Sequence, residues 1–91
     1  MIFEWDEHKC CENIRKHGFD FRDCAAIFRW HTATLVDQRF DYGEERWRTV
    51  GLLRERVVVV VYVVRGNVLR VISMRKASKH EQTSFFESFE D

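Results

Sequence analysis

The feature that constrains the fold most is an unbroken apolar run from Val57 to Val64, which contains seven valines and one tyrosine. β-branched side chains lose rotamer freedom in a helix and pack well on a pleated strand. A run without polar alternation is typical of a strand that is buried on both faces. Its eight residues are far fewer than the ~20 that a membrane-spanning helix needs. We therefore predict the central strand of a sheet and no membrane segment.

The sequence on either side of this run predicts the rest of the sheet. Further strands are predicted at four segments, which are residues 1–5, 32–36, 45–53 and 68–74. Two tripeptides predict tight turns because Gly, Asn and Asp tolerate left-handed backbone, namely Asp41-Tyr42-Gly43 and Arg65-Gly66-Asn67. Strands joined by such short turns pair antiparallel. We therefore expect a twisted antiparallel sheet.

Capping signals predict three helices. Asp6 is a good N-cap and Gly18 a left-handed C-cap, so that a first helix lies between them. Asp20 begins a second helix, which is expected to end near residue 30. Ser78 and Glu81 have the spacing of a capping box that opens a last helix. Two N-terminal helices, an antiparallel sheet and a C-terminal helix predict an α+β fold, formed by one domain of residues 1–91.

The cysteines indicate a reducing compartment. There are three, and the adjacent Cys10 and Cys11 would form only a strained disulfide with each other. No basic leader with a small-residue cleavage site precedes the first helix. We therefore expect reduced thiols and a cytoplasmic protein.

The charge is unevenly distributed, although the net charge is zero. Residues 56–80 carry six Lys and Arg side chains and no acid, which indicates a positive surface that phosphates would seek. Within this segment, Arg75, Lys76, Lys79 and His80 lie where the last strand ends and the last helix begins. Cations at a helix N-terminus make an anion site. The alternative is a solvated strand end followed by an ordinary helix cap.

Two other groups of residues are candidates for chemistry. His17, next to Lys16, can transfer a proton near neutral pH, and it can equally be a half-buried histidine with a backbone partner. Arg46 and Arg48 share one face of a predicted strand and can clamp phosphate oxygens. Trp47, between them, either stacks on a base or packs in the core.

The sequence does not predict a metal site. The residues that would have to form it lack the C-x-x-C spacing of structural zinc sites: His8, Cys10, Cys11, His17 and Cys24. The sequence also contains no P-loop, dinucleotide fingerprint or nucleophile elbow. We therefore predict neither a metal nor another cofactor.

Four segments of the chain form a recognisable series. They are Phe3-Glu4-Trp5-Asp6-Glu7-x-Lys9, Asn13-x-x-Lys16-His17-Gly18 with Phe21 after it, Tyr42-Gly43-Glu44-Glu45-Arg46, and Ile72-Ser73-x-Arg75-Lys76-Ala77-Ser78-x-x-Glu81. Their order and intervals, over nearly the whole chain, resemble the BrnT family, whose members are toxins of bacterial type II toxin–antitoxin systems. The conjunction of the four segments, rather than any one of them, makes the resemblance specific.

This resemblance implies a RelE-like fold, in which helices pack on one side of a twisted antiparallel sheet and the other side engages RNA. The implied activity is a metal-independent endoribonuclease that inhibits translation and growth. The implied partner is a BrnA-type antitoxin with a DNA-binding domain. Operator DNA would then be contacted mainly through the antitoxin.

The residues fit this implied chemistry. Metal-free RNA cleavage needs a base for the 2′-hydroxyl, an acid for the leaving 5′-oxygen and cations for the phosphate. His17 is the candidate base or acid, and Arg46, Arg75 and Lys76 are the candidate phosphate binders at the catalytic centre. The further candidates for RNA binding are Lys16, Arg48 and Lys79.

Two other interpretations remain open. One is a toxin-derived module that has lost activity and binds a partner; the other is a nucleic-acid-binding domain without catalysis. The second lacks the aromatic pairs and the charge excess typical of such domains. A face of Phe85, Phe86 and Phe89 on the last helix either covers the sheet or serves a protein interface.

Overall fold

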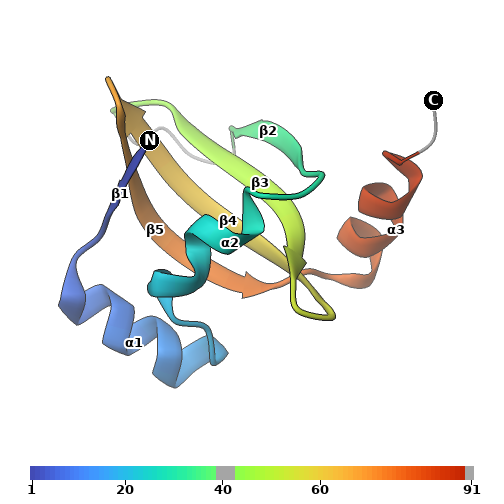
Figure 1. The fold of residues 1–91 in the computed structure, drawn as a ribbon, viewed down its shortest axis with the longest axis horizontal. Coiled ribbons are helices and arrows are strands. Elements are labelled where there is room, and N and C mark those ends of the chain that lie inside the picture. The colour runs from blue at the N-terminus through green and yellow to red at the C-terminus, as the bar shows by residue number, and fades with distance from the viewer. Residues whose placement is uncertain (39–42, 90–91) are drawn as a thin grey trace.

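The computed structural model describes residues 1–38 and 43–89, and it places the valine run at the centre of a five-stranded sheet (Figure 1). The strands are β1 (Ile2–Glu4), β2 (Ala33–Asp37), β3 (Arg46–Leu53), β4 (Arg56–Arg65) and β5 (Val68–Lys76), in the order β1-β5-β4-β3-β2 across the sheet. The helices in the described ranges are α1 (Glu7–His17), α2 (Cys24–Ile27), which follows a 3-10 turn (Phe21–Asp23), and α3 (Lys79–Glu87). The predicted α+β class and central strand are confirmed, and each strand lies within two residues of its predicted bounds.

Both predicted turns can be located, but only one can be assessed. Gly66 has a φ of 60° in the short connection between β4 and β5, so the left-handed turn predicted there is confirmed. The turn predicted at Asp41-Tyr42-Gly43 falls on residues that lie mostly outside the described ranges.

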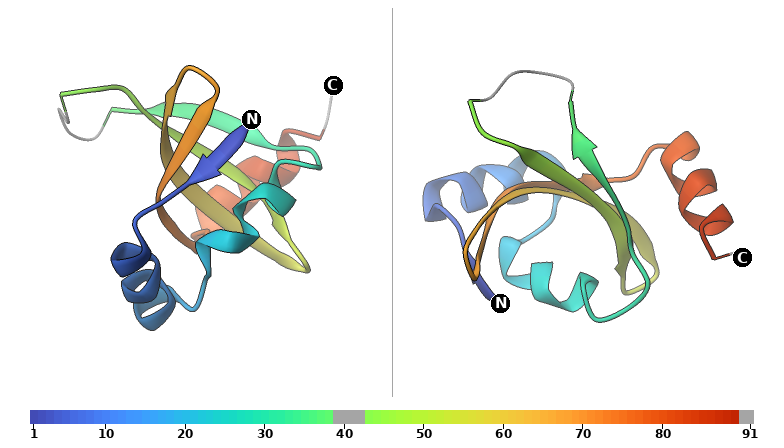
Figure 2. Two further views of the ribbon diagram at one scale, coloured as in Figure 1. Left: turned by 60° about the vertical axis from the view of Figure 1, so that its left-hand side comes forward. Right: turned by 90° about the horizontal axis from the view of Figure 1, so that it is seen from above.

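Alternation along β4 divides the core between the two sides of the sheet. Val58 and Val60 pack with Phe21 on the side where α1 and α2 lie. Val57 and Val59 pack with Phe85 of α3 on the opposite side. Figure 2 shows α2 within the curve of the sheet and α3 outside it. The strand is therefore buried on both faces, as its composition requires.

The expectation of a wholly antiparallel sheet is wrong at one edge. β1 pairs with β5 in parallel, from Ile2 opposite Val68 to Glu4 opposite Arg70, while the other strand pairs are antiparallel. This direction leads the chain from Glu4 toward the C-terminal half of β5. There α1 takes over the edge, because Asn13 bonds to the backbone of Met74. An antiparallel β1 would carry the chain away from that half.

The second predicted helix is also wrong in extent. In place of one helix from Asp20 to residue 30, the chain forms a 3-10 turn and the single-turn α2, which ends at Ile27. Phe28 then packs on Tyr62, with ring centroids 5.5 Å apart, and this tertiary contact overrides the helical periodicity. Ile27 lies so close to β3 that a Cβ atom at Gly51 would be 2.7 Å from its Cγ2 atom. Gly51 is therefore required for α2 to sit on the sheet.

Asn13 joins α1 to the sheet. Its side chain is buried, and its Nδ2 atom donates to the carbonyl oxygens of Phe19 and Met74, both at 2.9 Å. Its Oδ1 atom accepts from the Met74 amide at 3.1 Å. These bonds satisfy backbone groups of β5 where β1 has ended, so Asn13 takes the place of a neighbouring strand.

The start of α3 is fixed by the predicted capping box and by one ion pair. The Ser78 hydroxyl accepts from the Glu81 amide, and the Glu81 carboxylate accepts from the Ser78 amide at 2.8 Å. The same carboxylate accepts hydrogen bonds from both terminal nitrogens of Arg75, at 2.8 and 2.9 Å. Arg75 thereby connects the C-terminal end of β5 to the first turn of α3. This paired geometry is the strong form of a carboxylate–guanidinium contact.

We predict that Asn13→Ala lowers the free energy of unfolding by about 2 to 4 kcal/mol, because it leaves buried backbone groups without partners. Urea unfolding followed by circular dichroism measures this loss. The adjacent Glu12→Ala, which removes only a surface ion pair with Arg15, serves as the control and is expected to have a much smaller effect. Equal effects of the two variants would contradict the role given to Asn13.

We also predict that the Arg75–Glu81 pair makes stability depend on acid pH. The hydrogen bonds from Arg75, followed by those from Ser78, lower the pKa of Glu81 from 4.5 to about 2. Because the folded pKa is the lower one, the stabilisation is complete above pH 4.5 and is lost as the pH falls toward 2. After allowance for solvent screening it amounts to roughly 1 to 2 kcal/mol.

Glu81→Gln removes the titrating group, so the difference in unfolding free energy between the parent and this variant should shrink over that pH range. Urea unfolding at a series of pH values tests this. A difference that stays constant from neutral pH to pH 3 would contradict the prediction.

Candidate functional site

The side of the sheet that faces away from α1 and α2 carries four arginines of the strands. We call it the open face and define it by Arg46, Arg48, Arg70, Ser73 and Arg75. Strand register places them together, because Arg48 and Ser73 flank Val61, Arg70 flanks Val63 and Arg75 flanks Val59. These valines alternate with the core residues Val58, Val60 and Tyr62. α3 covers one end of the open face through Phe85.

The arginines of the open face differ in their availability to a ligand. Arg70 pairs with Glu4 at 2.9 Å, Arg75 is held by Glu81, and Arg46, half-buried like Arg48, takes part in a further interaction. Within residues 1–38 and 43–89, the Arg48 guanidinium makes no ion pair and no hydrogen bond. Arg48 is therefore the arginine of this face best able to bind an incoming anion.

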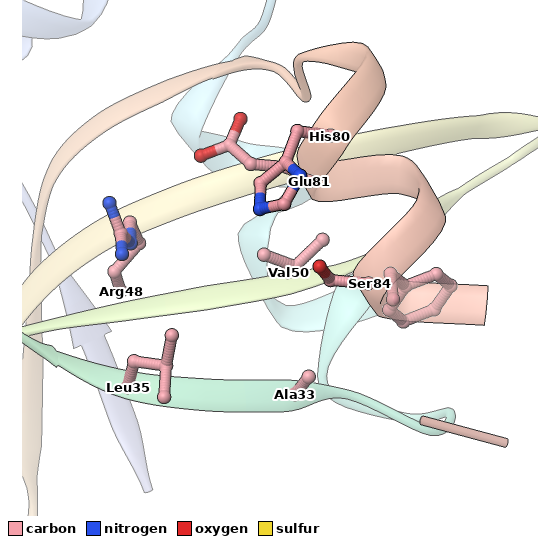
Figure 3. Close-up of a pocket in the computed structure, with 8 residues that line it drawn as sticks. Ala33, Leu35, Arg48, Val50, His80, Glu81 and Ser84 are labelled. Atoms are coloured by element: carbon pink, nitrogen blue, oxygen red, sulfur yellow. The ribbon is translucent and has the colours of Figure 1, made fainter. Parts of the chain in front are cut away.

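Arg48 lines a pocket beneath α3, which we call the α3 pocket (Figure 3). Its floor is apolar and consists of Ala33, Leu35, Val50 and Phe85, and its polar residues are Arg48, His80, Glu81 and Ser84. Figure 3 shows the His80 ring and the Glu81 carboxylate on α3 facing the opening that Arg48 borders from β3. The pocket thus joins a free guanidinium, an imidazole and a hydroxyl on an apolar base, an arrangement typical of ligand sites.

The electrostatics of the pocket assign different roles to its two titratable residues. Both oxygens of Glu81 already accept hydrogen bonds from Arg75, and its pKa of about 2 keeps it ionised and weakly basic. Glu81 is therefore suited to hold Arg75 in position rather than to transfer protons. His80 is exposed, and in the described part of the chain its ring has no hydrogen-bond partner. Its nitrogens remain available to a ligand.

A second hollow lies between α1 and β5, and we call it the α1–β5 groove. It is lined by Lys9, Glu12, Asn13, Lys16 and His17 of α1 and by Ile72 and Ser73 of β5. Lys16 and His17 are exposed in the last turn of α1, where positive charge is favourable to the helix dipole. The alternative of a half-buried histidine is therefore wrong for His17.

The predicted site residues are divided between these places. Arg48 lines the α3 pocket, and Arg75 contacts its Glu81. Arg46 lies elsewhere on the open face, and Lys76 and Lys79 are exposed where β5 leads into α3. His17 and Lys16 line the groove at the outer edge of β5 instead. The sheet separates the groove residue Ser73 from Arg48 by two strand spacings, which is about 10 Å.

Sequence reasoning passed over two pocket residues. The sequence places His80 within a basic segment without giving it a role of its own, and it gives no role to Ser84. A signal for both was present, because residues four apart share a helix face and the capping box fixes where α3 begins. That this face lines the same pocket as Arg48 depends on how α3 packs on the sheet, which the sequence does not show. Trp47 is half-buried and packs against the core, so the core interpretation of this residue is confirmed.

The aromatic face of α3 covers the sheet only in part. Phe85 is 1% exposed, whereas Phe86 and Phe89 remain 51% and 50% exposed. The His31 ring lies against Phe89, with centroids 4.3 Å apart, and connects the chain before β2 to the end of α3. Of the two alternatives for this face, covering the sheet holds for Phe85, whereas Phe86 and Phe89 remain half exposed.

The described ranges contain neither a group of metal-binding side chains nor a membrane-spanning helix. Among residues 1–38 and 43–89, no three His, Cys, Asp or Glu side chains are arranged to hold a metal ion. In the same ranges, no helix has the length and apolar character needed to cross a membrane.

Comparisons with known proteins identify the family. The family model described as "Ribonuclease toxin, BrnT, of type II toxin-antitoxin system" matches residues 5–81. Among solved structures, the crystal structure of the Brucella abortus ribonuclease toxin BrnT is 31% identical in sequence, with a TM-score of 0.65. The match covers 87% of this chain and 100% of the Brucella chain. No curated protein matches the sequence.

The family match extends over most of the chain and includes both hollows described above, apart from the last residues of α3. The structural match indicates more than a shared fold, because the two chains are also 31% identical in sequence. The resemblance found in the four sequence segments is thereby confirmed, and this chain belongs to the BrnT family of ribonuclease toxins of type II toxin–antitoxin systems.

Proposed function

We propose that this protein is an endoribonuclease toxin that cleaves RNA without a metal ion and so inhibits translation and growth. In this proposal it acts in the cytoplasm on a RelE-like fold. A BrnA-type antitoxin neutralises it, and operator DNA is reached through that antitoxin. The family description supports the toxin and ribonuclease parts of this statement.

The observation that carries the proposal is that Arg48 and His80 both line the α3 pocket and that Arg48 has no ion pair in the described ranges. Cleavage by an adjacent 2′-hydroxyl requires a group that removes its proton and a cation for the charge on the phosphate. His80 supplies the first and Arg48 the second. The proton of the 2′-hydroxyl passes to His80 as the 2′-oxygen attacks phosphorus and the bond from phosphorus to the 5′-oxygen breaks. The leaving 5′-oxygen takes a proton from water, and the products carry a 2′,3′-cyclic phosphate and a 5′-hydroxyl.

The remaining cations of this end of the sheet support the same reaction. Arg75 is kept beside the pocket by its two hydrogen bonds to Glu81. Lys79 is exposed at the start of α3 and adds positive charge near the pocket. Lys76 is exposed at the end of β5, where its register opposite Val58 places it on the side of α1 and α2, and it adds positive charge at that end of the sheet. Arg46 extends this positive surface along β3. Fixed cations in such a site stabilise a transition state without having to reorganise.

His17 has a different place in this proposal from the one expected from the sequence. It lines the α1–β5 groove, whereas the free arginine lines the α3 pocket. We therefore assign proton transfer to His80 and RNA binding to His17. The sequence-based assignment of His17 as the base remains a prediction, and the experiment below decides between the two histidines.

We predict that His80→Ala and Arg48→Ala each lower kcat for RNA cleavage by about 10²-fold or more, with RNA affinity largely kept in His80→Ala. His17→Ala should raise KM more than it lowers kcat. The assay uses purified protein, single-stranded RNA and excess EDTA, and it identifies the chemical ends of the products. His8→Ala removes another exposed histidine, outside both hollows, and is the matched control.

Each outcome has a distinct meaning. A loss of kcat in His17→Ala but not in His80→Ala would restore the assignment made from the sequence. Loss of cleavage by the parent in EDTA, recovered on addition of a divalent metal, would contradict metal independence. A parent that binds RNA without cleaving it would favour the non-catalytic binding domain. One that neither binds RNA nor arrests growth, but binds an antitoxin, would favour the inactive module.

A further inference from the structure

The α1–β5 groove carries charge that the reaction proposed for the α3 pocket does not use. Lys9 and Lys16 are seven residues apart on α1, so both lie on the helix face that Asn13 turns toward β5. Both are exposed and both line the groove, together with His17. In the described ranges neither ammonium group has a hydrogen-bond or ion-pair partner.

The one carboxylate of the groove lining is already engaged. Glu12 accepts two hydrogen bonds from Arg15 on the outer side of α1, the shorter at 2.6 Å. These bonds lower the pKa of Glu12 and keep it ionised, but its charge is balanced by Arg15. The charge left over in the groove is therefore positive. A small groove with two unpaired ammonium groups and polar walls is suited to a phosphate.

The groove is continuous with the open face through Ser73. Ser73 lines the groove. It also lies opposite Val61, which is paired on its other side with Arg48, so that Ser73, Val61 and Arg48 form one row across the sheet. This continuity is fixed rather than adjustable, because Asn13 bonds α1 to Met74, the residue after Ser73. A strand of RNA that reaches the α3 pocket across the open face can therefore continue over the edge of β5 into the groove.

We propose that the α1–β5 groove is a phosphate-binding subsite for single-stranded RNA, in which Lys9 and Lys16 hold the backbone of the strand whose cleavage takes place at the α3 pocket. This inference rests on the proposed function and adds to it a path and a minimum length for the substrate. RNA that is too short to span from Arg48 to the groove gains nothing from these lysines. Longer RNA binds more tightly because of them, in a way that salt weakens.

The test compares Lys9→Ala/Lys16→Ala with a control that removes the same charge elsewhere. Arg29→Ala/Arg54→Asn is suitable because both arginines are exposed and lie outside both hollows. Asn is chosen at position 54 because φ is 57° there, a conformation that Asn tolerates. The binding probe is a single-stranded RNA of about 12 nucleotides with 2′-O-methyl riboses, which binds but cannot be cleaved.

We expect the lysine double variant to bind this probe about tenfold more weakly than the parent, and its salt slope to fall by about 0.7 to 1.4. The control variant should bind like the parent. With cleavable RNA, KM should rise for a substrate of about 12 nucleotides and stay unchanged for one of about three, with kcat unchanged in both. Equal melting temperatures establish that the exposed lysines are not needed for folding.

Equal affinities of the lysine variant and the control would overturn the inference while leaving the proposed function intact. A fall in cleavage of the short substrate as well would also overturn it, because the groove would then belong to the reaction itself. A parent that binds the methylated probe but cleaves nothing would contradict the proposed function. The affinities would in that case still decide whether the groove binds RNA.

Discussion

The burial of β4 on both faces is the constraint on which the rest of the structure depends. A strand of this kind needs cover on two sides, and α1 and α2 provide it on one. On the other side α3 reaches only Val57 and Val59. Val61 and Val63 are nevertheless 4% and 1% exposed, and the residues in register beside them include arginines whose aliphatic stems are long enough to cover them. The arginines of the open face therefore also contribute to the burial of the valines of β4 through their aliphatic stems.

The ion pair between Arg75 and Glu81 connects this architecture to the chemistry. Glu81 completes the cap of α3, so its position is fixed by the helix, and Arg75 is fixed by the end of β5. Their contact brings the first turn of α3, with His80, over the strand that carries Arg48. A carboxylate so fully hydrogen-bonded is a poor proton acceptor. Glu81 therefore serves the site by holding Arg75 and the first turn of α3 in position. Proton transfer is left to its neighbour on the helix, His80, in the proposed reaction.

What the sequence could predict follows from the range of each interaction. The valine run, the alternation of β3 and the caps at Asp6, Gly18 and Ser78 are local signals, and the structure agrees with them. The direction of β1 and the short extent of α2 depend on contacts far along the chain, such as those between Asn13 and Met74. The candidate site shows the same division. Alternation put Arg46 and Arg48 on one face, but only the folded structure shows that His80 lines the same pocket as Arg48 and that His17 lines the other hollow.

A neutral chain is not an obstacle to phosphate binding when its acids are already paired. Near the two hollows, Glu4, Glu12 and Glu81 each form an ion pair with an arginine. Their negative charges are therefore balanced by those arginines rather than by the other cations of the hollows. Arg48, Lys9 and Lys16 have no such partner in the described ranges, and they face the open face or its edge. Affinity for a phosphate depends on the cations within a Debye length of it, about 10 Å at moderate salt, rather than on the sum over the chain. The zero net charge of the chain is therefore compatible with phosphate binding, because cations without a carboxylate partner in the described ranges line both hollows.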